Sequence, residues 1–208
     1  MSLLQRILEQ KLVAVVRAES AALAIDAAQA AFQGGIVLLE IAFTVPQAEE
    51  AISRLRKQLP QAVIGAGSIT TPDQAEAALQ AGAEFFVSPH TDPQLLQWFQ
   101  QRQLFYMPGG LTPSELMAAW KAGCAVQKFF PASVGGPAML RAILQPLPFL
   151  RPLASGGVDE QNALAFLQAG AAALNVGGSL FRKSYLQQKD WKAIESASAR
   201  LVQLCKGA

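Results

Sequence analysis

The sequence predicts an α/β protein, specifically a (β/α)8 TIM barrel that forms one domain over residues 1–208 with a short N-terminal helix. Eight short runs of β-branched, aromatic and aliphatic residues alternate with longer Ala-rich stretches, which favours parallel strands joined by helices. The runs are almost continuously apolar, as in strands covered on both faces. Eight units close a barrel, although this alternation alone also allows a doubly wound open sheet.

The elements follow in order along the chain. Residues 1–11 predict the short amphipathic helix, with Leu3, Leu4, Ile7 and Leu8 on one stripe. This segment lacks the basic start, long apolar stretch and cleavage site of a secretory signal. The eight predicted strands span residues 13–17, 37–43, 63–69, 85–90, 104–110, 125–131, 151–157 and 173–180.

Residues typical of helix starts and helix ends lie between these predicted strands. A hydroxyl or carboxylate cap followed by proline predicts helix starts at Thr71-Pro72, Asp92-Pro93 and Thr112-Pro113. Small-residue stops predict helix ends at Gly34-Gly35, Ala81-Gly82, Ala122-Gly123 and Ala169-Gly170. A dinucleotide-binding fold is disfavoured, because the first strand-to-helix junction, VVRAESAA, has no glycine cluster.

Composition excludes several classes of function. A formal net charge of +2, with scattered basic residues, does not indicate a nucleic-acid partner. No apolar run approaches the roughly 18 residues that a membrane span needs. The two cysteines predict free thiols in a reducing cytoplasm, and a single histidine leaves too few ligands for a metal site. We therefore expect a cytoplasmic protein without metal or cofactor.

Active sites of such barrels lie at the C-terminal ends of the strands. Polar residues late in the apolar runs are therefore the candidates: Arg17, Glu40, Ser68, His90, Lys128, Ser155 and Ser179. Arg17, Glu40 and Lys128 are ionisable, and burying an ionisable group without a partner is costly. His90 fits a loop at the rim of the site better than a catalytic base.

Lys128 is the most informative candidate, because every other lysine falls in a predicted helix, terminus or loop. Burial lowers the pKa of a lysine, and a neutral amine can attack a carbonyl to form an imine. Glu40 could serve such an imine as its proton shuttle, directly or through water. The structural alternatives are a lysine that snorkels from an edge strand, or a buried Glu40–Lys128 ion pair kept for stability.

Two glycine pairs end the seventh and eighth predicted strands, in Ser155-Gly156-Gly157 and Gly177-Gly178-Ser179. Backbone amides at these two junctions commonly bind phosphate in such barrels. One pair alone could be a turn, but two at the last two strands predict a phosphate site.

The stretches LLEIAFT, IGAGSIT, FFVSPH, YMPGG, QKFFPAS, LASGGV and NVGGSLF resemble, in order and spacing, the 2-keto-3-deoxy-6-phosphogluconate (KDPG) and 2-keto-4-hydroxyglutarate (KHG) aldolases. The resemblance covers residues 13 to about 181 and implies a metal-free class I aldolase on a (β/α)8 barrel, usually a homotrimer. It implies that Lys128 forms the Schiff base and that Glu40 is the general acid/base.

The resemblance also implies the binding residues. Gly156, Gly157, Gly178 and Ser179 would bind phosphate, Ser68 the pyruvate carboxylate, and Pro89 and Phe130 would line the pyruvate pocket. Two positions depart from the family pattern: Thr44 replaces an arginine that binds the carboxylate in some members, and Ser155 replaces the usual threonine. Other members end the first strand with an arginine, so Arg17 is expected to bind the substrate carboxylate instead.

The sequence therefore predicts an aldolase that cleaves KDPG into pyruvate and glyceraldehyde 3-phosphate. Related keto acids, KHG or the phosphogalactonate epimer, are alternative substrates. A non-catalytic barrel that senses a phosphorylated ligand is the alternative from another class of function.

Overall fold

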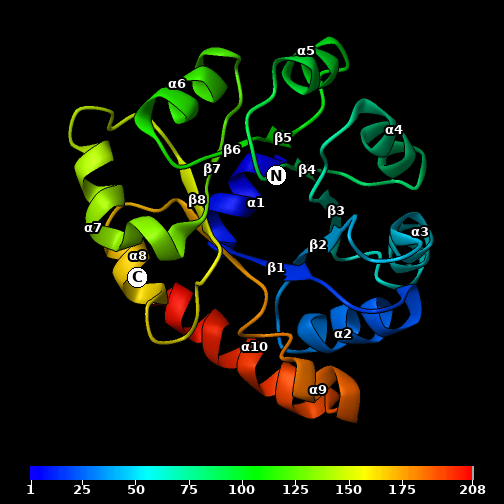
Figure 1. Cartoon of the computed structure of the whole chain (residues 1–208). Coiled ribbons are helices and arrows are strands. Elements are labelled where there is room, and N and C mark those ends of the chain that lie inside the picture. The colour runs from blue at the N-terminus through cyan, green and yellow to red at the C-terminus, as the bar shows by residue number, and fades with distance from the viewer. Residues whose placement is uncertain (208) are drawn as a thin grey trace.

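Nine short strands form one parallel sheet in the computed structural model, which describes residues 1–207 (Figure 1). Ala208, the last residue of the predicted domain, lies outside the described residues. The strands are β1 Leu12–Val16, β2 Leu38–Ala42, β3 Val63–Gly67, β4 Phe86–Val87, β5 Tyr106–Met107, β6 Gly109–Gly110, β7 Gln127–Phe129, β8 Pro152–Ser155 and β9 Ala173–Val176. Their order is β5-β4-β3-β2-β1-β9-β8-β7-β6, and every pairing is parallel.

The ring closes through Pro108, which alone separates β5 from β6. β5 pairs with β4, and β6 pairs with β7. Proline has no amide hydrogen, so it interrupts the hydrogen-bond ladder. Its carbonyl still accepts from the Lys128 amide at 2.8 Å. β5 and β6 thus occupy the place of a single barrel strand, so the nine strands fill eight positions. This confirms the predicted (β/α)8 barrel and excludes the open sheet.

The predicted strands extend too far at their C-terminal ends. Arg17, Ser68, His90 and Ser179 lie beyond β1, β3, β4 and β9, in the loops that lead to the next helices. Two strands end just before a residue with a left-handed backbone conformation. Ser68 follows β3 and has a φ of 58°, and Gly156 follows β8 and has a φ of 86°. Apolar composition alone does not locate this change of backbone direction.

The predicted helix signals are confirmed. Thr71, Asp92 and Thr112 each accept a hydrogen bond from an amide three residues later. Gly35, Gly82, Gly123 and Gly170 have positive φ values just after helix ends. The helices are α1 Leu3–Gln10, α2 Ala21–Gln33, α3 Ala48–Gln58, α4 Pro72–Gln80, α5 Pro93–Gln101, α6 Pro113–Lys121, α7 Ala132–Leu144, α8 Ala163–Gln168, α9 Lys183–Gln188 and α10 Trp191–Lys206. None of these helices is both long and apolar enough to cross a membrane.

Side chains that alternate along the strands build two cores. One set packs outward against the helices. The other fills the N-terminal half of the barrel with Val13, Leu38, Val63, Phe85, Val87, Met107, Val126, Leu153 and Ala173. α1 covers that end with the buried Ile7, and it lies at the centre of the ring in Figure 1. Polar chemistry in the interior is therefore restricted to the C-terminal half.

Candidate active site

A layer of polar side chains lies directly above the apolar layer of the barrel. Glu40, Lys128, Ser155 and Asn175 are all at most 3% exposed. Each follows a member of the apolar layer by two residues, namely Leu38, Val126, Leu153 and Ala173. A spacing of two returns a strand residue to the same face. The four side chains therefore point into the interior, at the end where such barrels hold their active sites.

Lys128 is 1% exposed and lies on β7, which pairs with β6 and β8. Burial lowers the pKa of this amine; the Glu40 charge opposes the shift and the Arg17 charge adds to it. Its Nζ lies 5.0 Å from the centroid of the Phe130 ring. The burial and the two strand neighbours rule out a lysine that snorkels from an edge strand.

The ion pairs found among residues 1–207 all lie on the surface, and none joins Glu40 to Lys128 within 4.0 Å. A stabilising Glu40–Lys128 ion pair is therefore not the reason for this lysine. The geometry leaves an amine that is biased toward its neutral form, as imine formation requires.

Glu40 is fully buried on β2, and two neighbours hold its carboxylate. Its Oε2 accepts a hydrogen bond from Nδ2 of Asn175 on β9. Its Oε1 lies over Gly67, where a Cβ atom would come within 1.8 Å of that oxygen. Gly67 therefore provides the space for the carboxylate. Oε1 has no hydrogen-bond partner among the described residues and can exchange a proton with a bound molecule.

A cavity of about 310 Å³ opens above this layer, at the ends of β1, β7, β8 and β9. It brings together most of the predicted binding residues with others that were not predicted, among them Asp159 and Asn175. The lining includes Arg17, Phe130, Ser155, Gly156, Gly157, Asn175, Gly178 and Ser179. Lys128 and Glu40 do not line the cavity themselves, but Phe130 lines it and its ring centroid lies 5.0 Å from the Lys128 amine, so the amine lies next to this opening.

Hydrogen bonds within and between the two glycine loops of the cavity, which follow β8 and β9, fix the positions of these loops. Gly156 and Gly157 have φ values of 86° and 83°, which only glycine adopts without strain. The Asn162 amide donates to the Gly157 carbonyl at 2.8 Å. The Ser179 hydroxyl donates to the Val158 carbonyl at 2.8 Å and so joins the two loops.

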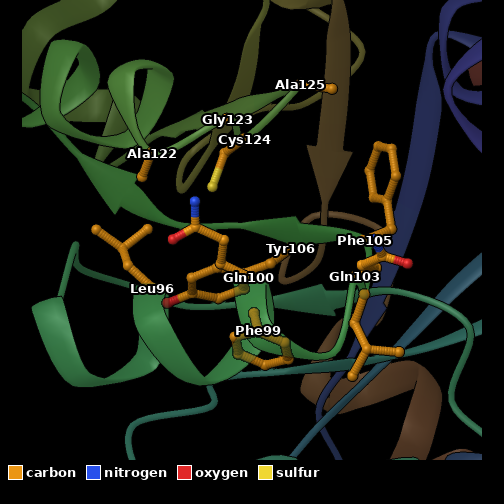
Figure 2. A pocket seen from close by; sticks show the side chains of 11 residues that line it. Leu96, Phe99, Gln100, Gln103, Phe105, Tyr106, Ala122, Gly123, Cys124 and Ala125 are labelled. Carbon is orange, nitrogen blue, oxygen red and sulfur yellow. The ribbon is translucent and has the colours of Figure 1, made fainter.

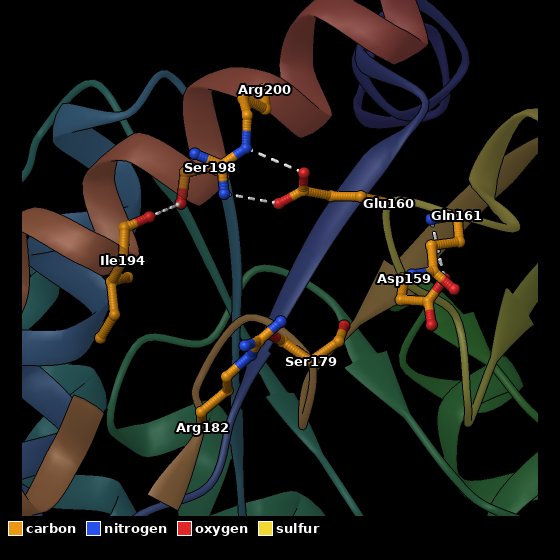
Figure 3. A network of polar contacts seen from close by, with 8 residues as sticks. All are labelled: Asp159, Glu160, Gln161, Ser179, Arg182, Ile194, Ser198 and Arg200. Atoms are coloured by element: carbon orange, nitrogen blue, oxygen red, sulfur yellow. Dashed lines mark hydrogen bonds and ion pairs between the residues drawn. The ribbon is translucent and has the colours of Figure 1, made fainter. Parts of the chain in front are cut away.

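A surface ion pair attaches the loop after β8 to the C-terminal helix. Arg200 on α10 makes two hydrogen bonds of 2.8 Å to the Glu160 carboxylate (Figure 3). Across the same region, Nε of Arg182 donates to the Ser179 carbonyl at 3.2 Å. The loops therefore present their glycines in a preorganised arrangement, and backbone amides held in this way can bind an anion.

The remaining predicted residues lie at the same end of the barrel but outside this cavity. Thr44 is exposed and lines a separate cavity of about 420 Å³, which also includes Arg17 and Lys183. Arg17 therefore lies between the two cavities, and it is exposed rather than buried as expected. Ser68 and Pro89 are partly buried in the loops after β3 and β4.

Asn175 and Gly67 are the two neighbours of the Glu40 carboxylate that sequence reasoning missed. Asn175 carries the same signal as Glu40 and Lys128, a polar side chain within an apolar strand, so the pattern could have revealed it. Gly67 gives no comparable signal, because its role depends on the position of a side chain from the neighbouring strand.

Another cavity, also of about 310 Å³, lies outside the barrel, where Cys124 faces Tyr106 and residues of α5 (Figure 2). None of the predicted site residues lines it. Cys124 and Cys205 are free, and burial raises the pKa of their thiols to about 12 and about 11. Both are therefore protonated at neutral pH and are poor nucleophiles.

Known proteins share this arrangement over almost the whole chain. The family model described as KDPG and KHG aldolase matches residues 3–197. The chain belongs to the KDPG and KHG aldolase family. It is therefore an aldolase, a carbon–carbon lyase, as its resemblance predicted.

Named relatives place this aldolase among enzymes for related substrates. It is 33% identical to the 2-dehydro-3-deoxy-phosphogluconate aldolase of Pseudomonas aeruginosa, over 94% of this chain and 89% of the relative. It is also 33% identical to the KHG/KDPG aldolase of Escherichia coli K12, over 88% of this chain and 86% of the relative. The Legionella pneumophila KDPG aldolase, crystallised with pyruvate as a covalent carbinolamine, superposes with a TM-score of 0.85 at 28% identity, covering 99% and 98% of the two chains.

Proposed function

We propose that this aldolase cleaves KDPG reversibly into pyruvate and glyceraldehyde 3-phosphate through a Schiff base at Lys128. The observation that carries the proposal is the buried Lys128 amine, without an ion pair, beside the Glu40 carboxylate in the barrel interior. Relatives named for this substrate, and the covalent carbinolamine in the Legionella enzyme, support the same reaction.

The reaction begins when Nζ of Lys128 attacks the C2 carbonyl of the substrate, and the carbinolamine loses water to give an imine. The C4 hydroxyl then loses its proton, the C3–C4 bond breaks, and glyceraldehyde 3-phosphate leaves. The electron pair of the broken bond is held as an enamine. Protonation at C3 and addition of water release pyruvate and restore the amine, so all atoms balance.

Glu40 moves the protons in these steps. Its free Oε1 can take the proton of the C4 hydroxyl and return a proton to C3, directly or through water. The carboxylate faces a low-dielectric interior, where a correctly placed base acts without large reorganisation.

The cavity supplies the anion sites for the two ends of the substrate. The amides of Gly156, Gly157, Gly178 and Ser179 bind the phosphate, since the two loops hold them in a fixed arrangement. Arg17 and Ser68 bind the carboxylate, while Pro89 and Phe130 line the pyruvate pocket. Thr44 lines the adjoining cavity and contributes no charge.

The working enzyme is, in this proposal, a cytoplasmic homotrimer without metal or cofactor. Its partners are small phosphorylated keto acids and no nucleic acid or membrane. Sedimentation would test the trimer, and unchanged turnover after treatment with EDTA would test the metal-free mechanism.

Comparison of substrates tests the proposed specificity. We expect kcat/KM to be highest for KDPG, followed with a coupled assay for pyruvate. The unphosphorylated 2-keto-3-deoxygluconate should be poorer by about two decades or more, because two hydrogen bonds to a charged group are worth about 1.5–3 kcal/mol each. Higher kcat/KM for KHG or for the phosphogalactonate epimer would support the alternative aldolases instead. No cleavage of any of them would favour a phospho-ligand sensor.

A further inference from the structure

Asn175 on β9 has a polar side chain that the stability of the fold does not explain. It is 1% exposed within an apolar strand, and a buried amide is costly unless its groups are hydrogen-bonded. Only one of its two polar atoms has a partner, because Nδ2 donates to Glu40 while Oδ1 accepts no hydrogen bond among residues 1–207. The unpartnered Oδ1 costs stability, so the one hydrogen bond that this amide makes, to Glu40, is the contact to explain.

The position of Asn175 connects it to the reacting groups. Its backbone pairs with Val13 of β1 and with Ser155 of β8, so its side chain lies between the proton shuttle and the cavity that opens above. It lines that cavity together with Arg17 and Phe130. A residue kept only for packing would not need to reach this surface.

The contact with Glu40 fixes which oxygen is free. Gly67 provides space for Oε1, and the Asn175 donor binds Oε2, so the carboxylate has one occupied oxygen and one oxygen without a partner among the described residues. Without the donor, the carboxylate could rotate or approach the Lys128 amine. Misplacement of a reacting group by about 1 Å can cost about 10²-fold in rate.

We propose that Asn175 is a positioning residue that orients the Glu40 carboxylate for proton transfer. The inference rests on the proposed Schiff-base function, and it adds a residue that acts through Glu40 rather than on the substrate. Arg17 and Asp159 are the charged residues that line the cavity with Asn175, and neither Arg17 nor Lys128 forms an ion pair with Glu40 within 4.0 Å that would replace the Asn175 donor.

The test uses pyruvate alone, so it does not depend on which sugar acid is the substrate. In deuterated water, Glu40 should remove C3 protons of the pyruvate imine and return deuterons, which NMR records as loss of the methyl signal. Asn175→Leu keeps a similar volume but removes the donor. We expect its exchange rate to fall by about 10- to 100-fold, while borohydride still traps pyruvate on Lys128 and KM for pyruvate changes little.

A double-mutant cycle separates positioning from general damage. If Asn175 acts through Glu40, then Asn175→Leu should cause little further loss of exchange in a Glu40→Gln background. Ser198→Ala is the matched control, since it removes a buried hydrogen bond to the Ile194 carbonyl on α10, away from the barrel interior. It should leave exchange unchanged.

Thermal unfolding completes the design, because Asn175→Leu leaves Oε2 of the buried Glu40 without its donor and should unfold at a lower temperature than the wild type, so exchange is measured well below that temperature. Wild-type exchange in Asn175→Leu, or additive losses in the cycle, would overturn the inference and leave the proposed function intact. If Asn175→Leu is unfolded at the assay temperature, Asn175→Ser, which is too short to reach Glu40, replaces it in the same cycle. Absence of trapping on Lys128 in the wild type would instead overturn the proposed function.

Discussion

Two ionisable side chains, Lys128 and Glu40, carry the chemistry at the scale of single residues. Both are buried without an ion pair between them, so each charge is compensated only in part. Such sites cost stability and are maintained for function. This loss of stability in favour of function leads to two predictions, one on the pH dependence of stability and one on the catalytic rate.

The first prediction concerns the pH dependence of stability. Burial lowers the pKa of Lys128 in the folded state, whereas the unfolded chain restores a value near 10.4. Between the two values the unfolded state binds more protons, so this lysine makes wild-type stability rise with pH. Lys128→Met lacks that titration. Its melting temperature should exceed the wild-type value most at neutral pH, and the advantage should shrink toward pH ~10. A constant difference from neutral to alkaline pH would contradict a depressed pKa.

The second prediction separates catalysis from binding at Glu40. Glu40→Gln keeps the shape of the side chain, and its carbonyl oxygen can still accept from Asn175, but the NH2 group in place of Oε1 cannot accept a proton at neutral pH. We expect kcat to fall by about 10²–10⁴-fold with little change in KM, because a proton shuttle acts in the transition state. Steady-state kinetics with KDPG measures both parameters. A raised KM at normal kcat would assign Glu40 to substrate binding instead.

At the scale of elements, the strands and the loops that follow them supply different parts of the site. β2, β7, β8 and β9 set the interior layer by their period of two, while the loops after β8 and β9 form the anion site. Gly157 is a poor position for a test of this site, because its φ is positive and a Cβ atom would come within 2.5 Å of Ser133. Gly178 is suitable, since its φ is not in the left-handed region and a Cβ atom there would meet nothing within 4 Å.

The third prediction uses this difference. Gly178→Asp adds a negative charge at the phosphate loop, and Gly178→Asn adds the same shape without the charge. A like charge at close range costs on the order of 1 kcal/mol or more, so kcat/KM for KDPG should fall about tenfold further in the aspartate variant. Unphosphorylated 2-keto-3-deoxygluconate should show little difference between the two variants. Equal effects on both substrates would mean that the loop does not bind phosphate.

Much of the architecture could be predicted from the sequence, because helix caps and glycine stops depend on local geometry. Thr71, Asp92 and Gly82 show this for the helices. Glu40 and Lys128 could be predicted because an ionisable residue stands out in an apolar strand. The strand ends at Arg17 and Ser68, and the space at Gly67, could not, because they depend on backbone direction and on neighbouring strands.

The whole molecule is a barrel with an apolar N-terminal half, closed by α1, and a polar C-terminal half. This division places a desolvated amine next to an open cavity, which is the arrangement that imine chemistry needs. Family membership, the fold and the interior layer agree on one reaction type, aldol cleavage. The central claim is therefore that Lys128 forms the covalent intermediate.

Borohydride reduction in the presence of pyruvate tests that claim most directly. Reduction converts the imine into a stable carboxyethyl group on the lysine nitrogen, which peptide mass spectrometry locates. We predict one adduct, on Lys128, and none in Lys128→Arg, whose guanidinium cannot form the imine. An adduct on Lys121 or Lys183, or none on the wild-type protein, would contradict the account.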